Sequence, residues 1–250
     1  MRKTLIFISL LFTLSTVFGQ EKQKRVYFTD PGELIFQFTQ TNIEDNTAQN
    51  GVRTSYFTNV PYFMNINYNN HFGLMPGISI KNIGIKTKNE QIVRNNDTMT
   101  YDHIKRRVFT AGISVAAKFG WFDKGSWLYA GGGVDWAFHY RQKLYETSGN
   151  KKVTKEGEWL SDATPNLIPS AFVGIQTPIS LNIKATYYFN DFLNKNYNGT
   201  LGNFSKITQS QLLTISLSII LKERIIEAYN SANSPDFQFE QRKKGKTIEL

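Results

Sequence analysis

Hydrophobic and polar residues alternate along much of the chain, and the clearest example is the segment 166–190. Its second half has an apolar or aromatic residue at every other position from Ile179 to Phe189, with polar or amphipathic residues between them. Side chains of a β-strand point to opposite faces in turn, so this pattern predicts a strand with one apolar and one polar face. The first half alternates in the same way. Thr177 and Pro178 separate the halves, which predicts a hairpin.

The same alternation recurs along the chain and predicts eight strands. They cover approximately residues 33–41, 56–68, 72–83, 107–119, 127–143, 166–176, 179–190 and 211–221. Short turns and long polar segments alternate strictly between them, and the long segments are 42–55, 84–105, 144–165 and 191–209. An up-and-down transmembrane barrel has this arrangement, with short periplasmic turns and long outer loops. The predicted fold is therefore all-β, an eight-stranded antiparallel up-and-down transmembrane β-barrel.

The two ends of the chain predict export and a short tail. Arg2 and Lys3 precede an apolar run over residues 5–17, and the small residue Gly19 follows, as in a secretory signal peptide. The apolar run is too short to cross a bilayer as a helix. We therefore predict a signal peptide at 1–19, a polar lead-in at 20–31, the barrel at 32–222 and a poorly ordered periplasmic tail at 223–250. The predicted location is the outer membrane.

Composition narrows the chemistry. The chain has 29 Lys and Arg against 20 Asp and Glu, but these basic residues are scattered and form no nucleic-acid motif, so no nucleic-acid partner is expected. The absence of cysteine excludes disulfides, cysteine-based zinc sites and thiol catalysis. His71, His103 and His139 are too dispersed to predict a metal site. His139 could join Ser170 and Asp135 in a triad, but no nucleophile motif supports it. We predict no enzymatic activity, metal or cofactor.

The polar faces of the strands predict a filled interior. An eight-stranded barrel is just wide enough to be filled by side chains. Buried charges without partners are costly, so opposite charges are expected to pair and leave no open pore. We expect Asp135 to pair with Lys184 or Lys81, and Glu33 to pair with Lys118 or Lys222. The predicted polar network of the lumen consists of Glu33, Lys81, Lys118, Asp135, His139, Arg141 and Lys184.

Aromatic residues gather near the ends of the predicted strands. Tyrosine and tryptophan are enriched where a membrane protein crosses the two interfaces of the bilayer. The pattern therefore predicts two aromatic girdles, and their candidate residues are Trp121, Trp127, Trp136, Phe138, Tyr140, Tyr187 and Phe189.

Three segments resemble a known group of proteins. The segments are residues 73–85 (GLMPGISIKNIGI), 127–143 and 172–194. They resemble Bacteroidota-type proteins with an outer membrane protein β-barrel domain, among the small OmpA/PorT-like barrels. The resemblance implies contact with outer-membrane lipid and lipopolysaccharide, and insertion by the barrel-assembly machinery. Such barrels often end on an aromatic residue that this machinery reads. Here Leu221 ends the last predicted strand and a tail follows, so the assembly signal is expected to be internal.

Two further sites depend on this resemblance or on the tail. Asp97, Thr98 and Met99 resemble the acceptor motif for O-glycosylation in this bacterial group, which makes Thr98 a candidate for modification. The mixed charge of the tail indicates disorder. The alternative is that its basic residues at 242–244 contact a periplasmic partner.

These observations favour a non-enzymatic outer-membrane barrel with a plugged polar lumen. Its expected role is structural, or interaction at the cell surface through the long loops. Three alternatives stay open at this stage. They are a small pore, transport or secretion-system component, an outer-membrane enzyme that modifies lipid, and a soluble periplasmic calycin-like barrel that binds an apolar ligand.

Overall fold

The computed structural model describes residues 26–29, 32–44, 48–56, 59–94, 97–145 and 152–219. These residues form strands and turns, and none of them belongs to a helix that could cross a membrane. The predicted signal peptide and the predicted tail lie outside the described residues. In the predicted lead-in, residues 26–29 form a strand.

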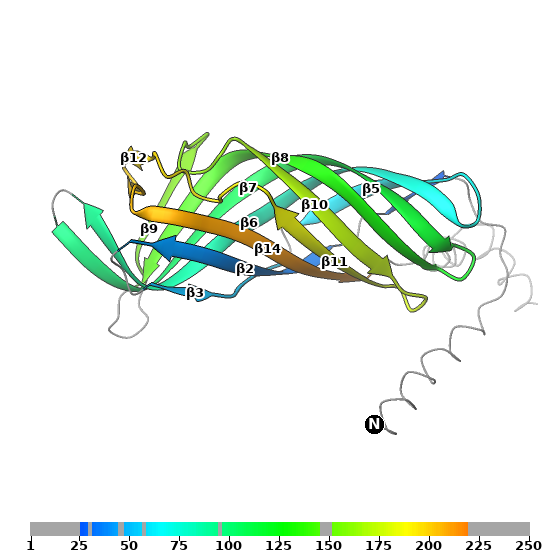
Figure 1. The fold of residues 1–250 in the computed structure, drawn as a ribbon, viewed down its shortest axis with the longest axis horizontal. Helices are drawn as coiled ribbons and strands as arrows, with labels where there is room; N and C mark the ends of the chain where they lie inside the picture. Colours follow the sequence, from blue (N-terminus) through cyan, green and yellow to red (C-terminus); the bar gives the residue numbers. More distant parts are fainter. Residues whose placement is uncertain are drawn as a thin grey trace, which may run out of the picture. The chain divides into compact units, whose positions relative to one another are not determined.

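Twelve strands form one antiparallel sheet, and a two-stranded hairpin stands apart from it. The strands of the sheet are β1 (Val26–Thr29), β2 (Glu33–Ile43), β3 (Gln49–Gly51), β4 (Arg53–Ser55), β5 (Val60–Asn67), β6 (Phe72–Arg94), β7 (Asp97–Trp121), β8 (Ser126–Tyr145), β9 (Lys152–Trp159), β10 (Leu167–Gln176), β11 (Leu181–Tyr188) and β14 (Ile207–Ile219). The separate hairpin consists of β12 (Asn198–Gly199) and β13 (Gly202–Asn203). Figure 1 shows the arrangement.

The predicted all-β antiparallel class is confirmed, whereas the predicted number of eight strands is not. Each predicted strand overlaps a strand of the main sheet, namely β2, β5, β6, β7, β8, β10, β11 or β14. The other four strands of the sheet lie in segments that were predicted to be loops or lead-in. The order along the sheet is β1-β5-β6-β7-β8-β10-β11-β14-β2-β4, with β3 paired to β6 and β9 paired to β8.

The prediction of a loop at 84–105 is wrong. Strands β6 and β7 continue through it as one hairpin, and their register runs from Phe72 opposite Phe119 to Arg94 opposite Asp97. Polar composition indicated a loop, but apolar residues of this segment are buried on the inner face, as Ile85 and Ile104 show. Strand β8 likewise extends to Tyr145 and pairs with β9, inside the predicted loop 144–165.

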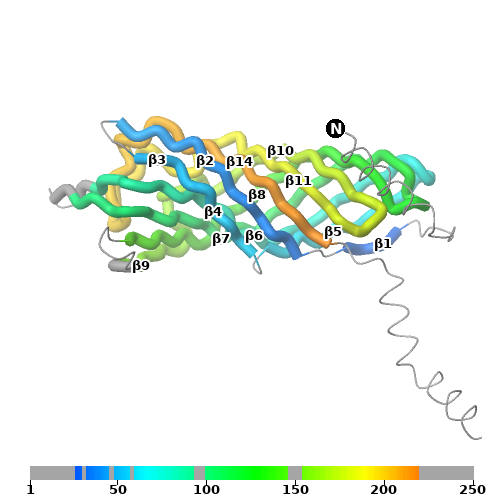
Figure 2. Tube along the Cα trace, turned by 90° about the horizontal axis from the view of Figure 1, so that it is seen from below, coloured from blue at the N-terminus to red at the C-terminus, as the bar shows by residue number. Residues whose placement is uncertain are grey.

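Strands β2 and β6 are joined through two short strands. Strand β4 pairs with β2 and β3 pairs with β6, and Val52 alone separates β3 from β4 (Figure 2). Side chains supplement these short ladders. The Gln37 amide donates to the Asn82 carbonyl at 3.1 Å and accepts from the Gly84 N–H. We call this junction the seam. The sheet is therefore connected from β2 to β6 by short pairings and side-chain bonds instead of a continuous ladder.

The outer face of the sheet is apolar near the short turns. These turns join β5 to β6, β7 to β8 and β10 to β11, and we call this the turn end. Large apolar side chains are exposed there on every long strand, and Ile113 reaches 69% exposure. We call this surface the apolar belt; its members include Leu34, Phe38, Val60, Tyr62, Phe72, Ile78, Ile80, Ile113, Val115, Phe119, Leu128, Val134, Leu167, Val173, Ile175, Tyr187, Leu213 and Ile219.

The inner face at this level holds buried charged side chains together with an apolar cluster. Lys118 is fully buried there, and Asp135, Glu33 and Lys184 are also buried. Beyond the belt, toward the end of the long β6–β7 hairpin, the pattern reverses and the interior becomes apolar. This hairpin-end core is formed by Ile83, Ile85, Val108, Ala137, Tyr140, Ala163, Ile168, Tyr188, Phe192, Leu193, Leu201, Phe204, Ile207 and Leu212. The strands thus change from apolar outside to apolar inside along their length.

Candidate functional site

Two buried ion pairs lie on the inner face at the level of the belt. Lys81 Nζ lies 2.8 Å from Asp135 Oδ2, which is one of the two pairings expected for Asp135. Lys184 pairs with Glu33, so the expectation that Glu33 pairs with Lys118 or Lys222 is wrong. Glu33 lies on β2 and Lys184 on β11, and β14 separates these strands in the sheet. The two side chains meet because both point inward.

Lys118 has a different environment from the paired lysines. Its ammonium donates to Asn65 Oδ1 at 2.9 Å and to the Tyr27 hydroxyl at 3.1 Å. The ammonium also lies over three aromatic rings, 4.6 Å from the centre of Phe122, 4.8 Å from that of Tyr27 and 5.1 Å from that of Trp127. Hydrogen bonds and aromatic faces together stabilise this buried cation.

Apolar layers enclose the ion pairs along the interior. One cluster packs around Lys184, whose Nζ lies 5.8 Å from the centre of the Phe63 ring and 5.9 Å from that of Phe172; its members are Phe63, Met75, Ala116, Phe122, Trp127, Tyr129 and Phe172. The hairpin-end core lies toward the other end. Above that core, Arg106 makes a two-pronged ion pair with Glu90, with N–O distances of 2.7 and 2.6 Å. Neither Arg106 nor Glu90 was predicted as an interior charge, because Glu90 lies in the segment 84–105 that was assigned to a loop and Arg106 directly follows it.

His139 and Arg141 do not belong to the interior, so that prediction is wrong. The register of β7 and β8 shifts at Phe138, where Phe109 lies opposite His139 but Thr110 lies opposite Ala137. This β-bulge adds one residue to β8 and reverses which positions face inward beyond it. The His139 ring consequently packs against the exposed Trp159 on the outer face, with the ring centres 4.3 Å apart. Strict alternation that ignores the bulge assigns His139 and Arg141 to the wrong face of the sheet.

The predicted aromatic girdle is divided between the two faces. Trp121, Trp136, Tyr187 and Phe189 are exposed, and Phe138 stacks on Trp159 at the outer face. Two assignments are wrong. Trp127 is buried on the inner side, whereas its neighbour Leu128 is exposed on the outer face. Tyr140 is buried because the bulge at Phe138 turns the side chain of this position inward.

The three residues considered for a catalytic triad do not lie together in the structure. Ser170 and Asp135 are both buried from the inner side, whereas His139 lies on the outer face. His71 contacts the Gly120 carbonyl, and His103 contacts Asp102. Among the described residues, no three His, Asp or Glu side chains form a group that could hold a metal ion. Thr98 lies in β7 with its backbone opposite Val93, and its modification stays a prediction.

Basic residues form two adjacent rows on the outer face, directly beyond the apolar belt. Lys86, Lys105, Lys143 and Lys155 lie opposite one another on β6, β7, β8 and β9. In the next row toward the belt, Arg107 lies opposite Arg141, with glycines on the flanking strands. We call these six residues the basic rows. Like charges directly opposite each other destabilise a sheet, so such rows need a reason other than stability.

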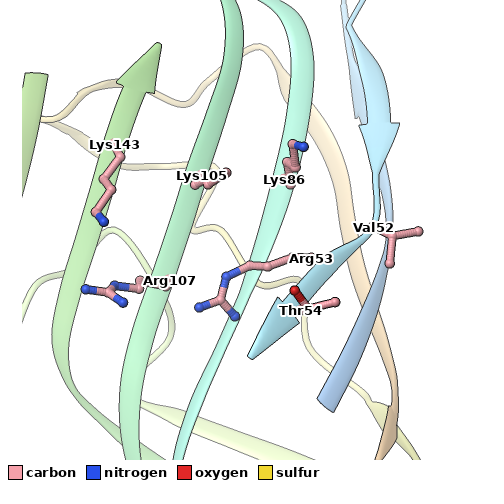
Figure 3. Close-up of a pocket in the computed structure, with 7 residues that line it drawn as sticks. All are labelled: Val52, Arg53, Thr54, Lys86, Lys105, Arg107 and Lys143. Carbon is pink, nitrogen blue, oxygen red and sulfur yellow. The ribbon is translucent and has the colours of Figure 1, made fainter. Parts of the chain in front are cut away.

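A shallow cavity of about 250 Å³ lies along the basic rows (Figure 3). Its lining includes Lys86, Lys105, Arg107 and Lys143, and Arg53 and Thr54 of β4 complete one side. The Arg53 guanidinium is fixed by the seam, since it donates to Asn82 Oδ1 at 2.6 Å and to the Asn82 carbonyl at 3.2 Å. The cavity therefore presents cations from four strands on one surface.

The cations of the basic rows affect one another. Partial burial, followed by repulsion from Lys105 and Lys88, lowers the pKa of Lys86. Partial burial, followed by repulsion from Arg141, lowers the pKa of Arg107. A bound anion would relieve this repulsion. The sequence carries a signal for the rows that was not used, because basic residues repeat at i and i+2 in 86–88, 105–107 and 141–143.

Glu158 at the end of β9 connects the neighbouring loops. Its carboxylate accepts hydrogen bonds from Ser161 at 2.7 Å, from Tyr197 at 3.2 Å and from Thr200. Although partial burial acts to raise its pKa, these hydrogen bonds hold the pKa of Glu158 below its ordinary value. Glu158 thereby connects β9 to the segment that contains β12 and β13.

Comparison with known proteins gives the following. No protein-family model matches the chain, and no curated protein sequence matches it. Among solved structures, Ail, the attachment invasion locus protein of Yersinia pestis, crystallised with the heparin analogue sucrose octasulfate, is 13% identical with a TM-score of 0.34; the match covers 77% of this chain and 97% of that chain.

Two further solved structures are similar to the same extent. The outer membrane protein OprG from Pseudomonas aeruginosa is 9% identical with a TM-score of 0.33, covering 80% of this chain and 95% of that chain. Acinetobacter baumannii CarO2 is 8% identical with a TM-score of 0.31, covering 78% and 100% respectively. TM-scores this low establish no shared fold, so no property of these proteins is transferred. The resemblance to Bacteroidota-type barrels stays a prediction.

Proposed function

We propose that the chain is an outer-membrane β-barrel protein without enzymatic activity, which acts as a structural or surface-interaction protein. One observation carries this proposal: at one level of the sheet the outer face is apolar and exposed while the inner face holds buried ion pairs. A soluble protein rarely exposes a contiguous apolar surface larger than a few hundred Å². A transmembrane barrel, in contrast, has an outward apolar band and a polar interior.

The two ends of the sheet support an orientation. Transmembrane barrels have short periplasmic turns and long extracellular loops. The turn end would then face the periplasm, and the β6–β7 hairpin, β9 and the loops held by Glu158 would extend outside the cell. The O-glycosylation proposed for Thr98 fits this exposed hairpin, and a mass shift on the peptide containing Thr98 would test it.

The same geometry weighs against the alternatives. A soluble calycin-like barrel would have an apolar interior beneath a polar outer face, the reverse of what lies at the belt. A pore would need open space where the ion pairs Lys81–Asp135 and Lys184–Glu33 lie between two apolar clusters. A lipid-modifying triad would need His139 on the same face as Ser170. The plugged interior leaves the outer loops as the proposed interaction surface.

Two measurements test the proposed function. After cell fractionation the protein should remain with outer membranes through a wash in alkaline carbonate, and the folded form should migrate differently from the boiled form in a denaturing gel. Purified protein in planar lipid bilayers should show no large, stable conductance. Recovery in the soluble periplasmic fraction would refute the barrel, and a steady channel of porin size would refute the plugged interior.

A further inference from the structure

We propose that the basic rows bind the phosphate groups of an outer-leaflet lipid headgroup, with the cavity at Arg107 and Lys105 as the centre of the site. This inference rests on the proposed function, because it places the rows at the border between hydrocarbon and headgroups. It adds a binding site of defined chemistry to a barrel that otherwise has only loops for its interactions.

The position of the rows relative to the belt identifies a lipid as the ligand. On β7 the outward residues run from Phe119 through Ile113 to Phe109, and the next two outward positions are Arg107 and Lys105. Apolar contact therefore gives way to positive charge within one step of the strand. Successive outward residues are separated by about 7 Å, which places the cations where headgroup phosphates begin.

Aromatic side chains lie on the same border. Phe109 and Phe138 have ring centres 6.4 Å apart, and His139 packs against Trp159. The Arg107 guanidinium lies 5.3 Å from the centre of the Phe109 ring. Such rings are enriched at the level of lipid headgroups. A ligand with acyl chains beside this cluster and phosphates above it would contact both surfaces at once. A soluble polyanion would use the rows alone.

The charge pattern identifies phosphate as the recognised group. Four lysines and two arginines occupy two adjacent rows, and the side chains of Glu156 and Glu158 on β9 point to the opposite face, where Glu156 accepts from Gln142. Arginine binds phosphate through two parallel N–H donors, and lysine acts as a point charge. The row of four strands spans about 14 Å, enough for more than one phosphate.

The decisive experiment measures lipid binding to the full-length protein, folded in neutral detergent, by native mass spectrometry. The probe is bisphosphorylated lipid A, compared with its monophosphorylated form. The test variant is Lys105→Gln/Arg107→Gln. The control, Lys124→Gln/Lys206→Gln, removes the same charge from exposed sites outside the rows. Each basic residue near a membrane contributes about 1 kcal/mol of attraction, so two should weaken binding by about 30-fold.

The expected result is tighter binding of the bisphosphorylated lipid, a loss of about 30-fold in the test variant, and little change in the control. Both variants should keep the mobility difference between folded and boiled forms; if the test variant does not fold, the single variant Lys105→Gln is measured instead, with a loss of about fivefold expected. Equal losses in test and control variants, or no preference between the two lipids, would overturn the site.

Two further arms separate the sources of phosphate. Inorganic phosphate should not displace the lipid at millimolar concentration, and displacement would reduce the site to one for free anions. Binding of a soluble sulfated oligosaccharide without binding of lipid A would likewise overturn the lipid assignment. If the protein is recovered outside the membrane fraction, the proposed function itself fails; a protein that is embedded but does not select phosphorylated lipid refutes this inference alone.

Discussion

Removal of Lys81 tests whether the interior at the belt is shielded from water. In the variant Lys81→Met, the carboxylate of Asp135 keeps its buried position but loses its partner. The matched control is Lys195→Met, which removes a lysine from an ion pair with Asp191 of the same 2.8 Å length. The two pairs differ in exposure: the Asp135 side chain is 2% exposed, whereas Lys195 and Asp191 are 44% and 24% exposed.

The expected magnitudes follow from this difference in burial. At 2.8 Å and an effective dielectric constant of about 20, the attraction between Lys81 and Asp135 is about 6 kcal/mol, before the cost of desolvating both ions is subtracted. Leaving one partner of a buried pair unpaired typically costs about 3–5 kcal/mol. An exposed pair contributes about 0–1 kcal/mol. The double variant Lys81→Met/Asp135→Leu should therefore recover most of the lost stability.

The assay is equilibrium unfolding in urea of protein folded into lipid vesicles, followed by tryptophan fluorescence. We expect Lys81→Met to lower the free energy of unfolding by about 3–5 kcal/mol and Lys195→Met by less than about 1 kcal/mol. Similar small losses in both variants would refute the reasoning. Such losses would mean that water reaches Asp135, as in an open pore, and that the interior at the belt is not filled by side chains.

Three further predictions concern the interior, the bulge and the loops. A Cβ atom at Gly112 would lie 1.9 Å from Asp135 Oδ1, so Gly112→Val should lower the free energy of unfolding by about 3 kcal/mol or more, and an unchanged urea midpoint would contradict this. Because the chain has no cysteine, single-cysteine variants can report the face of β8: a water-soluble maleimide should label Arg141→Cys rapidly and Gln142→Cys slowly, and the reverse order would place the bulge elsewhere. Since the folded pKa of Glu158 is lowered, its stabilisation is present above its ordinary pKa of 4.5 and is lost as pH falls. Limited proteolysis should cleave Glu158→Gln faster than wild type at pH 7, with the difference shrinking below pH 4.5, and a constant difference would argue against this role.

The sequence predicts the strands of the belt well because alternation is a local property. Each of the eight predicted strands exists, and the polarity of residues 179–189 is as expected for one apolar face. A bulge is also local, but it leaves no trace in alternation when aromatic residues such as Phe138 and Tyr140 fit either face. The faces of His139 and Arg141 were therefore assigned incorrectly.

Other features depend on long-range register, which the sequence pattern does not contain. The partner of Glu33 is Lys184, more than 100 residues away, and only the tilt and pairing of β2, β14 and β11 bring them together. The extension of β6 and β7 was missed for a different reason. Polar composition at 84–105 was interpreted as a loop, although the same composition suits an extended hairpin with a polar outer face that carries Lys86 and Lys105 of the basic rows.

The seam determines where this sheet is mechanically weakest. Strand β14, the last strand among the described residues, pairs with β2 along eleven register positions from Ile207 to Ser218, so the ladder between these two long strands is strongly bonded. The short ladders and the Gln37 amide of the seam lie between β2 and β6, which are separated in the sequence by β3, β4 and β5. A lateral opening of the sheet would therefore start at the seam, beside Gln37 and Asn82. It would leave the ladder between β2 and β14 intact.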